Sequence, residues 1–396
     1  MVKNTNLKST IQFLCYTALF AILTFPLFAT ELDLSQLRDP KTIKDKINKG
    51  FDVNAKRSVD GYTLLHYAAE LGNADLTKFL LSKGANTNEA MIRGNTPLST
   101  AIGFDKTEII KILLGAGVDP NYQLGEFDYK RSHFHYYMIK TRKFDPTIFN
   151  LFISKGADLE TRDFYTETPL ISAASLDFKS IQHSISLMNV GANQNAQTKF
   201  GKTPLMVSVF VRHFALVEEF IRRGVNIELE DSDGNTVLLA MINMGNKGSD
   251  SEDKPKLFQI LLQAGANPNH QNKEGDTALH LSVIGHSYEI LEILTKQNVD
   301  PNLRNRKSVT ALGQAIINEN WRAAKILLTI EKNINGLDKY GSTMLHSAIL
   351  NEKLELIKLL LEAGADPETK DQWGKSAIEF AERQNNPKVL KLLKKE

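Results

Sequence analysis

Short apolar runs separated by polar breaks recur along almost the whole chain. In Leu76–Leu81 and Ile109–Leu114, apolar residues fall at the three- and four-residue spacing of an amphipathic helix. Gly84 and Gly117 follow these runs, and glycine readily adopts the left-handed conformation that ends a helix. A shorter helix is predicted before each run, starting at a threonine such as Thr96, whose hydroxyl can cap the first backbone N–H groups. The pattern therefore predicts a succession of paired short helices.

These helix pairs repeat with a period close to 33 residues. The starts step by 33, 72, 35, 33, 41, 33, 33 and 33 residues through Thr63, Thr96, Thr168, Thr203, Thr236, Thr277, Thr310, Thr343 and Ser376. The step of 72 contains a further unit, because Ser132 lies 36 residues from the start on either side. A Gly-Ala-Asn type marker keeps the same period, although Asn298–Asp300 and Asn333–Asn335 lack its glycine. Such periodicity indicates one repeat array.

The repeat resembles that of a known family. The period of 33 residues and the segment Thr63–His66, with similar segments at Thr277 and Thr343, are similar to the Thr-Pro-Leu-His motif of ankyrin repeats. This resemblance implies an all-α ankyrin solenoid of about ten helix-turn-helix repeats with short turn or hairpin tips. It also implies that the motif histidines, among them His280 and His346, hydrogen-bond within and between repeats.

The period divides the chain into three regions. Residues 1–29 are expected to be a signal peptide or an N-terminal anchor, residues 30–59 a partial capping repeat, and residues 60–396 the ankyrin-repeat domain. The capping repeat is inferred because Lys41–Asn54 resembles the second helix of an earlier unit. The repeats are expected to start near Asp60, Arg93, Tyr129, Tyr165, Phe200, Asp233, Glu274, Lys307, Tyr340 and Trp373.

One repeat carries an insertion. The step from Thr236 to Thr277 is eight residues longer than the period, and the additional residues, 245–255, are rich in glycine, serine and charges. An insertion between the two helices of a unit costs little, because loop-closure entropy grows slowly with length. We expect a solvated loop, and a docking loop or an acidic phosphorylation target are the alternatives.

The unit around Ser132 is unusually aromatic. It lacks the turn glycine and contains Phe127, Tyr129, Phe134, Tyr136, Tyr137 and Phe144, interleaved with lysines and arginines. Rings that fill the core of a degenerate repeat are the simplest interpretation. A protein-binding pocket and base stacking on a nucleic acid are the alternatives.

The N-terminal residues have the pattern of an export signal. Lys3 and Lys8 flank a polar start, an apolar stretch covers Ile11–Leu23, and Ala29 offers a small residue for cleavage. The single cysteine, Cys15, lies in this stretch. The expected location is secreted or periplasmic, and an inner-membrane anchor is the alternative. The absence of Asn-x-Ser/Thr sequons favours a bacterial exporter.

Charge and motifs argue against several function classes. The chain has 48 Lys and Arg against 46 Asp and Glu, which leaves no global field to attract nucleic acid. No nucleophile elbow, phosphate-binding loop, dinucleotide-binding or zinc-protease motif occurs. We therefore expect no enzyme activity, no catalytic or metal-binding residues, no cofactor and no small-molecule substrate. The one alternative is a metal-dependent regulator or enzyme that uses His133 and His135.

Binding to a protein is the remaining function class. In ankyrin proteins the turn tips and the first helices line a concave groove that grips partners, and exposed aromatic residues are enriched at interfaces. Tyr165 and Phe200, and likewise Tyr340 and Trp373, occupy tips of adjacent repeats and are the expected partner-binding residues. The sequence thus indicates a monomeric interaction scaffold, either a periplasmic binding protein or a bacterial effector. A membrane-anchored spacer is the alternative.

Overall fold

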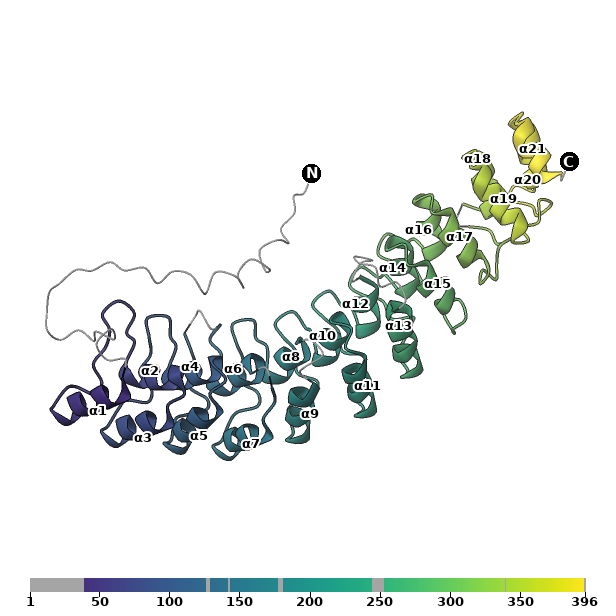
Figure 1. Cartoon of the computed structure of the whole chain (residues 1–396). Helices are drawn as coiled ribbons and strands as arrows, with labels where there is room; N and C mark the ends of the chain where they lie inside the picture. Colours follow the sequence, from purple (N-terminus) through teal and green to yellow (C-terminus); the bar gives the residue numbers. More distant parts are fainter. Residues whose placement is uncertain are drawn as a thin grey trace.

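The computed structural model describes residues 39–125, 129–141, 143–176, 181–243, 253–338 and 340–394. Within these ranges the chain forms helices and four isolated antiparallel β-bridges, with no longer strand. The helices, labelled as in Figure 1, are α1 (Pro40–Asn48), α2 (Leu64–Leu71), α3 (Ala74–Ser82), α4 (Pro97–Gly103), α5 (Thr107–Gly115), α6 (His133–Lys140), α7 (Pro146–Ser154), α8 (Pro169–Ala174), α9 (Ile181–Asn189), α10 (Pro204–Phe210), α11 (Phe214–Arg222), α12 (Val237–Asn243), α13 (Asp253–Gln263), α14 (Ala278–Ile284), α15 (Tyr288–Leu294), α16 (Ala311–Ile317), α17 (Trp321–Leu328), α18 (Met344–Leu350), α19 (Leu354–Glu362), α20 (Ala377–Arg383) and α21 (Pro387–Leu393).

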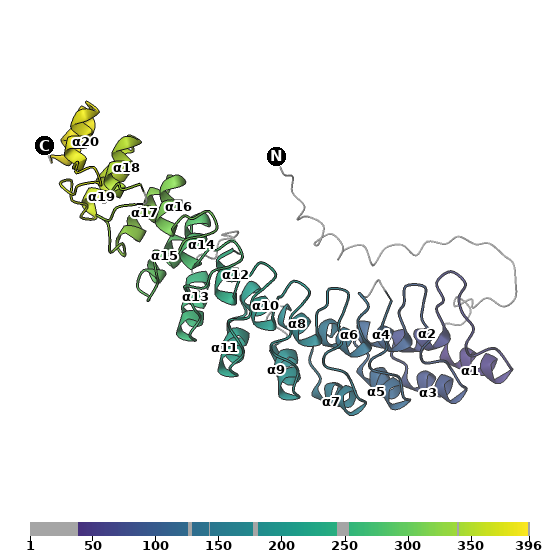
Figure 2. The ribbon, with the colours of Figure 1, turned by 180° about the vertical axis from the view of Figure 1, so that it is seen from behind.

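From α2 onward the helices form successive pairs stacked in two rows. Most of the first helices of the pairs, from α2 to α20, pack on the next first helix, and most of the second helices, from α3 to α21, do the same. Helix α1 packs against α3. Figures 1 and 2 show the two rows as an elongated, curved array with α1 near one end and α20 and α21 at the other. The prediction of an all-α repeat protein is confirmed.

Each first helix begins where its threonine or serine can cap it. Thr203 precedes α10, its Oγ1 accepts a hydrogen bond from Met206 N at 3.1 Å, and Pro204 takes the first helical position, where no N–H is needed. The apolar residues of both rows, including Leu205 and Phe220, are buried in one continuous core. Because a pair buries its apolar face only against its neighbours, packing between repeats holds the array together.

Hairpins between consecutive pairs project from the first-helix row (Figure 1). Most of them turn at a glycine with positive φ, such as Gly201 at +73°. A Cβ on Gly201 would lie 2.6 Å from the Cα of Asp231 in the next hairpin, so only glycine fits there. In three repeats other residues take the left-handed conformation, namely Lys130 with φ 56°, Thr166 with φ 63° and Ser308 with φ 59°.

Two predicted features fall partly or wholly outside the described residues. The signal peptide or anchor, residues 1–29, lies outside them, as do residues 245–252 of the insertion. The last insertion residues, Asp253–Pro255, were expected in a loop but form the first turn of α13, where an acidic residue is favourable. In the part of the chain that is described, no helix combines the length and apolar character needed to cross a membrane.

Candidate protein-binding surface

Backbone hydrogen bonds hold the hairpins in register. Phe164 N donates to the carbonyl of Tyr129 at 2.7 Å, and Ser232 N donates to the carbonyl of Phe200 at 2.8 Å. The same link recurs at the first hairpin, where Ile92 N donates to Asp60 O at 2.8 Å. The tips that these bonds link are therefore fixed relative to one another, and their side chains have defined spacing.

Long polar side chains add a second set of links between hairpins. Arg162 Nη1 donates to the carbonyls of Thr166 at 2.8 Å and Gln197 at 2.7 Å, so it ties its own hairpin to the following one. Gln197 Nε2 does the same, to Gly201 O and Glu230 O, both at 2.8 Å. These links were not predicted, although an Arg or Gln recurs in the sequence three residues before the tip.

All four predicted partner-binding residues lie exposed at hairpin tips. The exposed fractions are 42% for Tyr165, 51% for Phe200, 66% for Tyr340 and 65% for Trp373. Large rings are rarely left this exposed without a use, since they are enriched where proteins bind one another. The exposure that the sequence predicted is present, and a role in partner binding stays a prediction.

The tips of the third to fifth repeats carry four aromatic rings and one lysine in mutual contact. We call this set the hairpin ladder, and its members are Tyr129, Phe164, Tyr165, Lys199 and Phe200. The Tyr129 and Tyr165 ring centroids lie 5.5 Å apart, and Phe164 meets Tyr165 edge to face at 5.5 Å. Lys199 Nζ lies 5.5 Å from the Phe164 centroid and 5.2 Å from the Phe200 centroid. A lysine ammonium at these distances is attracted by both rings.

Sequence reasoning named only two members of the ladder as partner-binding residues. Phe164 and Lys199 were missed because each lies one residue before the tip position that was considered. Phe127, which the sequence placed with the aromatic repeat, lies outside the described residues. The rings inside that repeat, among them Phe134 and Tyr137, are buried, as expected if they fill its core.

The carboxylates of the fourth hairpin point inward and are already bound. The Asp163 side chain is completely buried, pairs with Arg131 at 3.1 Å and accepts from the backbone N–H groups of Tyr165 and Glu167. Glu167 Oε2 accepts from Ser172 Oγ at 2.6 Å. Charge on the outer side of this hairpin is therefore set by the cations that remain exposed.

His133 and His135 serve different neighbours and do not form a metal site together. His133 Nδ1 donates to Asp119 O at 2.9 Å, and Nε2 lies 2.6 Å from Thr96 Oγ1 in the preceding repeat. His135 Nε2 lies 2.8 Å from Ser172 Oγ in the following repeat. Burial lowers the pKa of His133 to about 4 and that of His135 to about 3, the latter with help from the Arg131 charge. Neutral, buried rings of this kind link repeats.

The described residues contain no cluster of three or more His, Cys, Asp or Glu side chains that could hold a metal ion. The geometry thus gives the alternative of a metal-dependent regulator at His133 and His135 no support. Three other histidines, His66, His280 and His346, follow the pattern implied by the resemblance. His66 Nε2, for example, donates to Asn95 O at 3.0 Å in the next repeat, while Nδ1 lies 2.8 Å from Thr63 Oγ1.

A comparison with protein families decides the kinship of the chain. The model for ankyrin repeats in three copies matches residues 34–123, 248–336, 285–371 and 322–396, together more than half of the sequence. The chain belongs to the ankyrin-repeat family. The array of helix pairs is therefore an ankyrin solenoid, and ankyrin repeats generally mediate protein–protein interaction.

Individual relatives match over shorter stretches of their own sequences. The chain is 26% identical over 197 residues to a putative palmitoyltransferase, ZDHHC13, of Danio rerio, covering 49% of this chain and 29% of that protein. It is 28% identical over 246 residues to Rabankyrin-5 of Mus musculus, and this match covers 58% of this chain and 19% of that protein. It shares 25% identity over 265 residues with the putative ankyrin repeat protein L371 of Acanthamoeba polyphaga mimivirus. This match covers 64% of this chain and 32% of that protein.

This ankyrin chain therefore spans less than a third of the length of each of these relatives. The matches support a common ankyrin architecture and nothing about the chemistry of the longer proteins. The kind of partner that this chain binds must therefore be inferred from its own surface.

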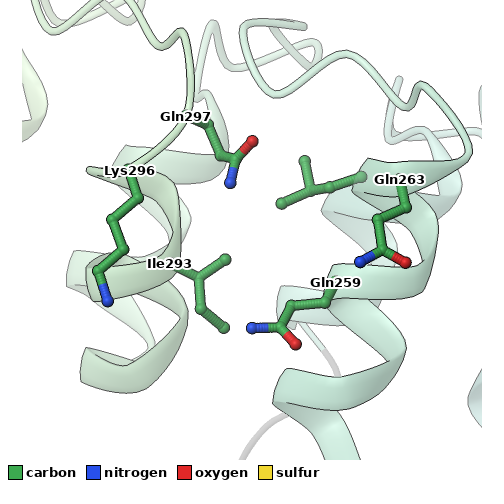
Figure 3. A pocket seen from close by; sticks show the side chains of 6 residues that line it. Gln259, Gln263, Ile293, Lys296 and Gln297 are labelled. Atoms are coloured by element: carbon green, nitrogen blue, oxygen red, sulfur yellow. The ribbon is translucent and has the colours of Figure 1, made fainter.

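Hollows in the described ankyrin array are small and open. Figure 3 shows one of about 290 Å³ between α13 and α15, lined by Gln259, Leu262, Gln263, Ile293, Lys296 and Gln297. Another, of about 510 Å³, lies between the second and third repeats beside Asp105, Tyr137 and Phe144. Polar and charged side chains contribute to the lining of both, among them Lys143 and Asp145 in the second.

The first helices of the later ankyrin repeats expose one further set of apolar side chains. These occupy the same place in the last turn of each helix and are Phe210, Ile284, Ile317 and Leu350. Sequence reasoning did not single them out, although their equal distance from the capping threonines was visible. They add apolar area to the row from which the hairpins project.

Proposed function

We propose that this chain is a scaffold that holds a partner protein in a concave groove formed by the hairpins and the first helices. The exposed rings at the hairpin tips carry the proposal, since Tyr165, Phe200, Tyr340 and Trp373 all project from turns that backbone hydrogen bonds hold in register. Rigid aromatic side chains lose little conformational entropy on binding and supply much contact area.

We also propose that the chain acts without catalysis, cofactor or metal. The rings of His133 and His135 bond to other repeats, and Ser172, which contacts His135, is itself buried. Buried groups of this kind have no access to a substrate. Tip variants are thus expected to lose partner binding, and neither they nor the unchanged protein are expected to bind a metal or turn over a substrate.

Export and a monomeric state belong to the same proposal. The pattern of residues 1–29 supports secretion or a periplasmic location, and a role as a bacterial effector would follow only after export. N-terminal sequencing of the protein from its source cells tests cleavage after Ala29. Light scattering on the purified chain tests the monomer.

The function is tested by capture of a partner. The chain and a variant with Tyr165, Phe200, Tyr340 and Trp373 all changed to Ala are used side by side on periplasmic and host-cell extracts. Val190→Ala, an exposed apolar change just after α9 in the second-helix row, is the matched control. A partner retained by the chain and the control but lost by the equally folded variant is expected. Failure to capture any partner would instead favour the anchored spacer.

A further inference from the structure

The hairpin ladder combines exposed rings with positive charge on adjacent tips. In the fourth and fifth hairpins, residues 162–168 and 197–203, the exposed cations are Arg162, Lys199 and Lys202. None of the three forms an ion pair with a carboxylate among the described residues. Arg162 donates to backbone carbonyls, Lys199 lies between two rings, and Lys202 Nζ lies 5.8 Å from the Phe210 centroid.

The acidic residues of the same hairpins have other partners among the described residues. Asp163 is buried against Arg131, and Glu167 accepts from Ser172 Oγ. Contact with a ring orients an ammonium but does not remove its charge, so its remaining N–H groups can still meet a carboxylate. The surface therefore offers cations and apolar rings in alternation.

The next hairpins along the array lack this combination. Asp231 and Asp233 occupy the sixth, Glu274 accompanies Lys273 in the seventh, and Arg306 lies 4.0 Å from Glu274. The described tips from the sixth to the eighth hairpin carry no aromatic residue. The eighth hairpin also carries exposed cations, Arg304 and Lys307, so the combination of rings with cations, rather than charge alone, distinguishes the ladder.

We propose that the hairpin ladder binds an extended, acidic segment of a partner protein, in which carboxylates alternate with apolar side chains. The proposal rests on the scaffold function proposed above and assigns the partner's chemistry. Carboxylates would meet Lys199, Lys202 and Arg162, and apolar side chains would pack on Phe164, Tyr165 and Phe200. Packed helices lie about 8–10 Å apart, so three adjacent tips span about 20 Å, or roughly six residues of extended chain.

A peptide fits this surface better than a nucleic acid does. Aromatic rings with lysines also bind single strands, but a phosphate backbone is followed by a continuous run of cations. Here Asp231 and Asp233 follow the ladder on the next hairpin, and the chain as a whole has 48 basic against 46 acidic residues. An acidic peptide needs only the local excess of positive charge.

The test uses the full chain and three fluorescent synthetic peptides of twelve residues. In the acidic probe Asp and Glu alternate with Leu and Phe, while the other two carry Lys or Ser in place of every acid. Fluorescence anisotropy should show binding of the acidic probe alone, weakened by salt. Lys199→Glu should weaken it about tenfold or more, and Phe200→Ala by a similar factor.

Lys307→Glu, at the exposed tip of the eighth repeat, is the matched control and should leave the affinity unchanged. Circular dichroism and urea midpoints establish that each variant is folded. Equal binding of the acidic probe to the chain and to Lys199→Glu, or preference for the lysine probe, would overturn the proposal. Tighter binding of a twelve-nucleotide oligothymidylate than of the acidic probe would also overturn it, in favour of nucleic acid.

Failure of this inference is distinguishable from failure of the scaffold function. If extracts yield a partner that depends on the tip residues while the acidic probe does not bind, the scaffold stands and the assignment of acidic chemistry is wrong. If neither a partner nor the probe binds, both proposals fail.

Discussion

Two regions of the array present aromatic tips in different ways. In the third to fifth hairpins Tyr165 contacts two other rings, and Lys199 bridges Phe164 to Phe200. At the C-terminal end Tyr340 and Trp373 are more exposed. Rings that are fixed in a ladder before binding lose less conformational freedom when a partner arrives than more exposed rings do. Similar residues at equivalent turns can thus differ in binding value.

The largest expected effect is a difference in stability between glycine substitutions in a tightly stacked hairpin and in the terminal hairpin. Gly201→Ala should destabilise the protein by about 3 kcal/mol, because the new Cβ meets the next hairpin's backbone and φ is positive. Gly374→Ala should cost about 1 kcal/mol, since φ is also positive but no atom lies within 4 Å of the added Cβ. Urea unfolding of both variants measures the difference, and equal midpoints would contradict the difference in packing.

The second largest expected effect is a loss of folding stability in acid, caused by the buried histidine beneath the ladder. The pKa of His135 is lowered to about 3 in the folded state, so the unfolded chain binds more protons below its usual pKa of about 6.5. Neutral His135 therefore contributes to the free energy of unfolding. This contribution is complete above pH 6.5 and is lost as the pH falls toward 3, by about 2 kcal/mol at pH 5. His135→Gln should lose this part of the pH dependence. An unchanged slope of stability against pH in that variant would contradict the assignment.

Single tip substitutions should separate the two aromatic regions in binding. Phe200→Ala should weaken the captured partner about tenfold, because it removes one end of the ladder and uncovers one face of Lys199. Trp373→Ala should have a smaller effect, since Trp373 is more exposed than Phe200 and no ring among the described residues is seen to hold it in place. Titration of the partner by calorimetry gives both values. A larger loss for Trp373→Ala would move the main contact to the C-terminal end.

The smallest effect concerns the hairpins that lack a turn glycine. Ser308→Gly should stabilise the protein by about 1 kcal/mol, because it relieves a left-handed conformation and no hydrogen bond of the serine hydroxyl is lost. Thr166→Gly should gain less, since Thr166 Oγ1 donates to Tyr165 O at 2.6 Å and accepts from Lys199 N in the ladder. Thermal unfolding compares the two. A greater gain at Thr166 would mean that these bonds add nothing.

Much of the fold was predictable because the signals are local. Thr203, Pro204 and the apolar spacing of Phe214–Arg222 specify where helices start and which face they bury, whatever lies around them. The hairpin tips were equally visible, and so were four of their rings. The helical first turn at Asp253–Pro255 was not, because loop-like composition does not exclude the start of a helix.

The sequence by itself determined the repeat period, the all-α array and the exposed position of Tyr165, Phe200, Tyr340 and Trp373. Only the tertiary structure decided that Lys199 lies between Phe164 and Phe200, and that His133 and His135 bond to opposite neighbours. The reason is physical: helix caps and apolar periodicity act within a few residues, whereas the contact of Lys199 with Phe164 and the histidine contacts join residues about one repeat apart. Their geometry exists only once adjacent repeats have stacked.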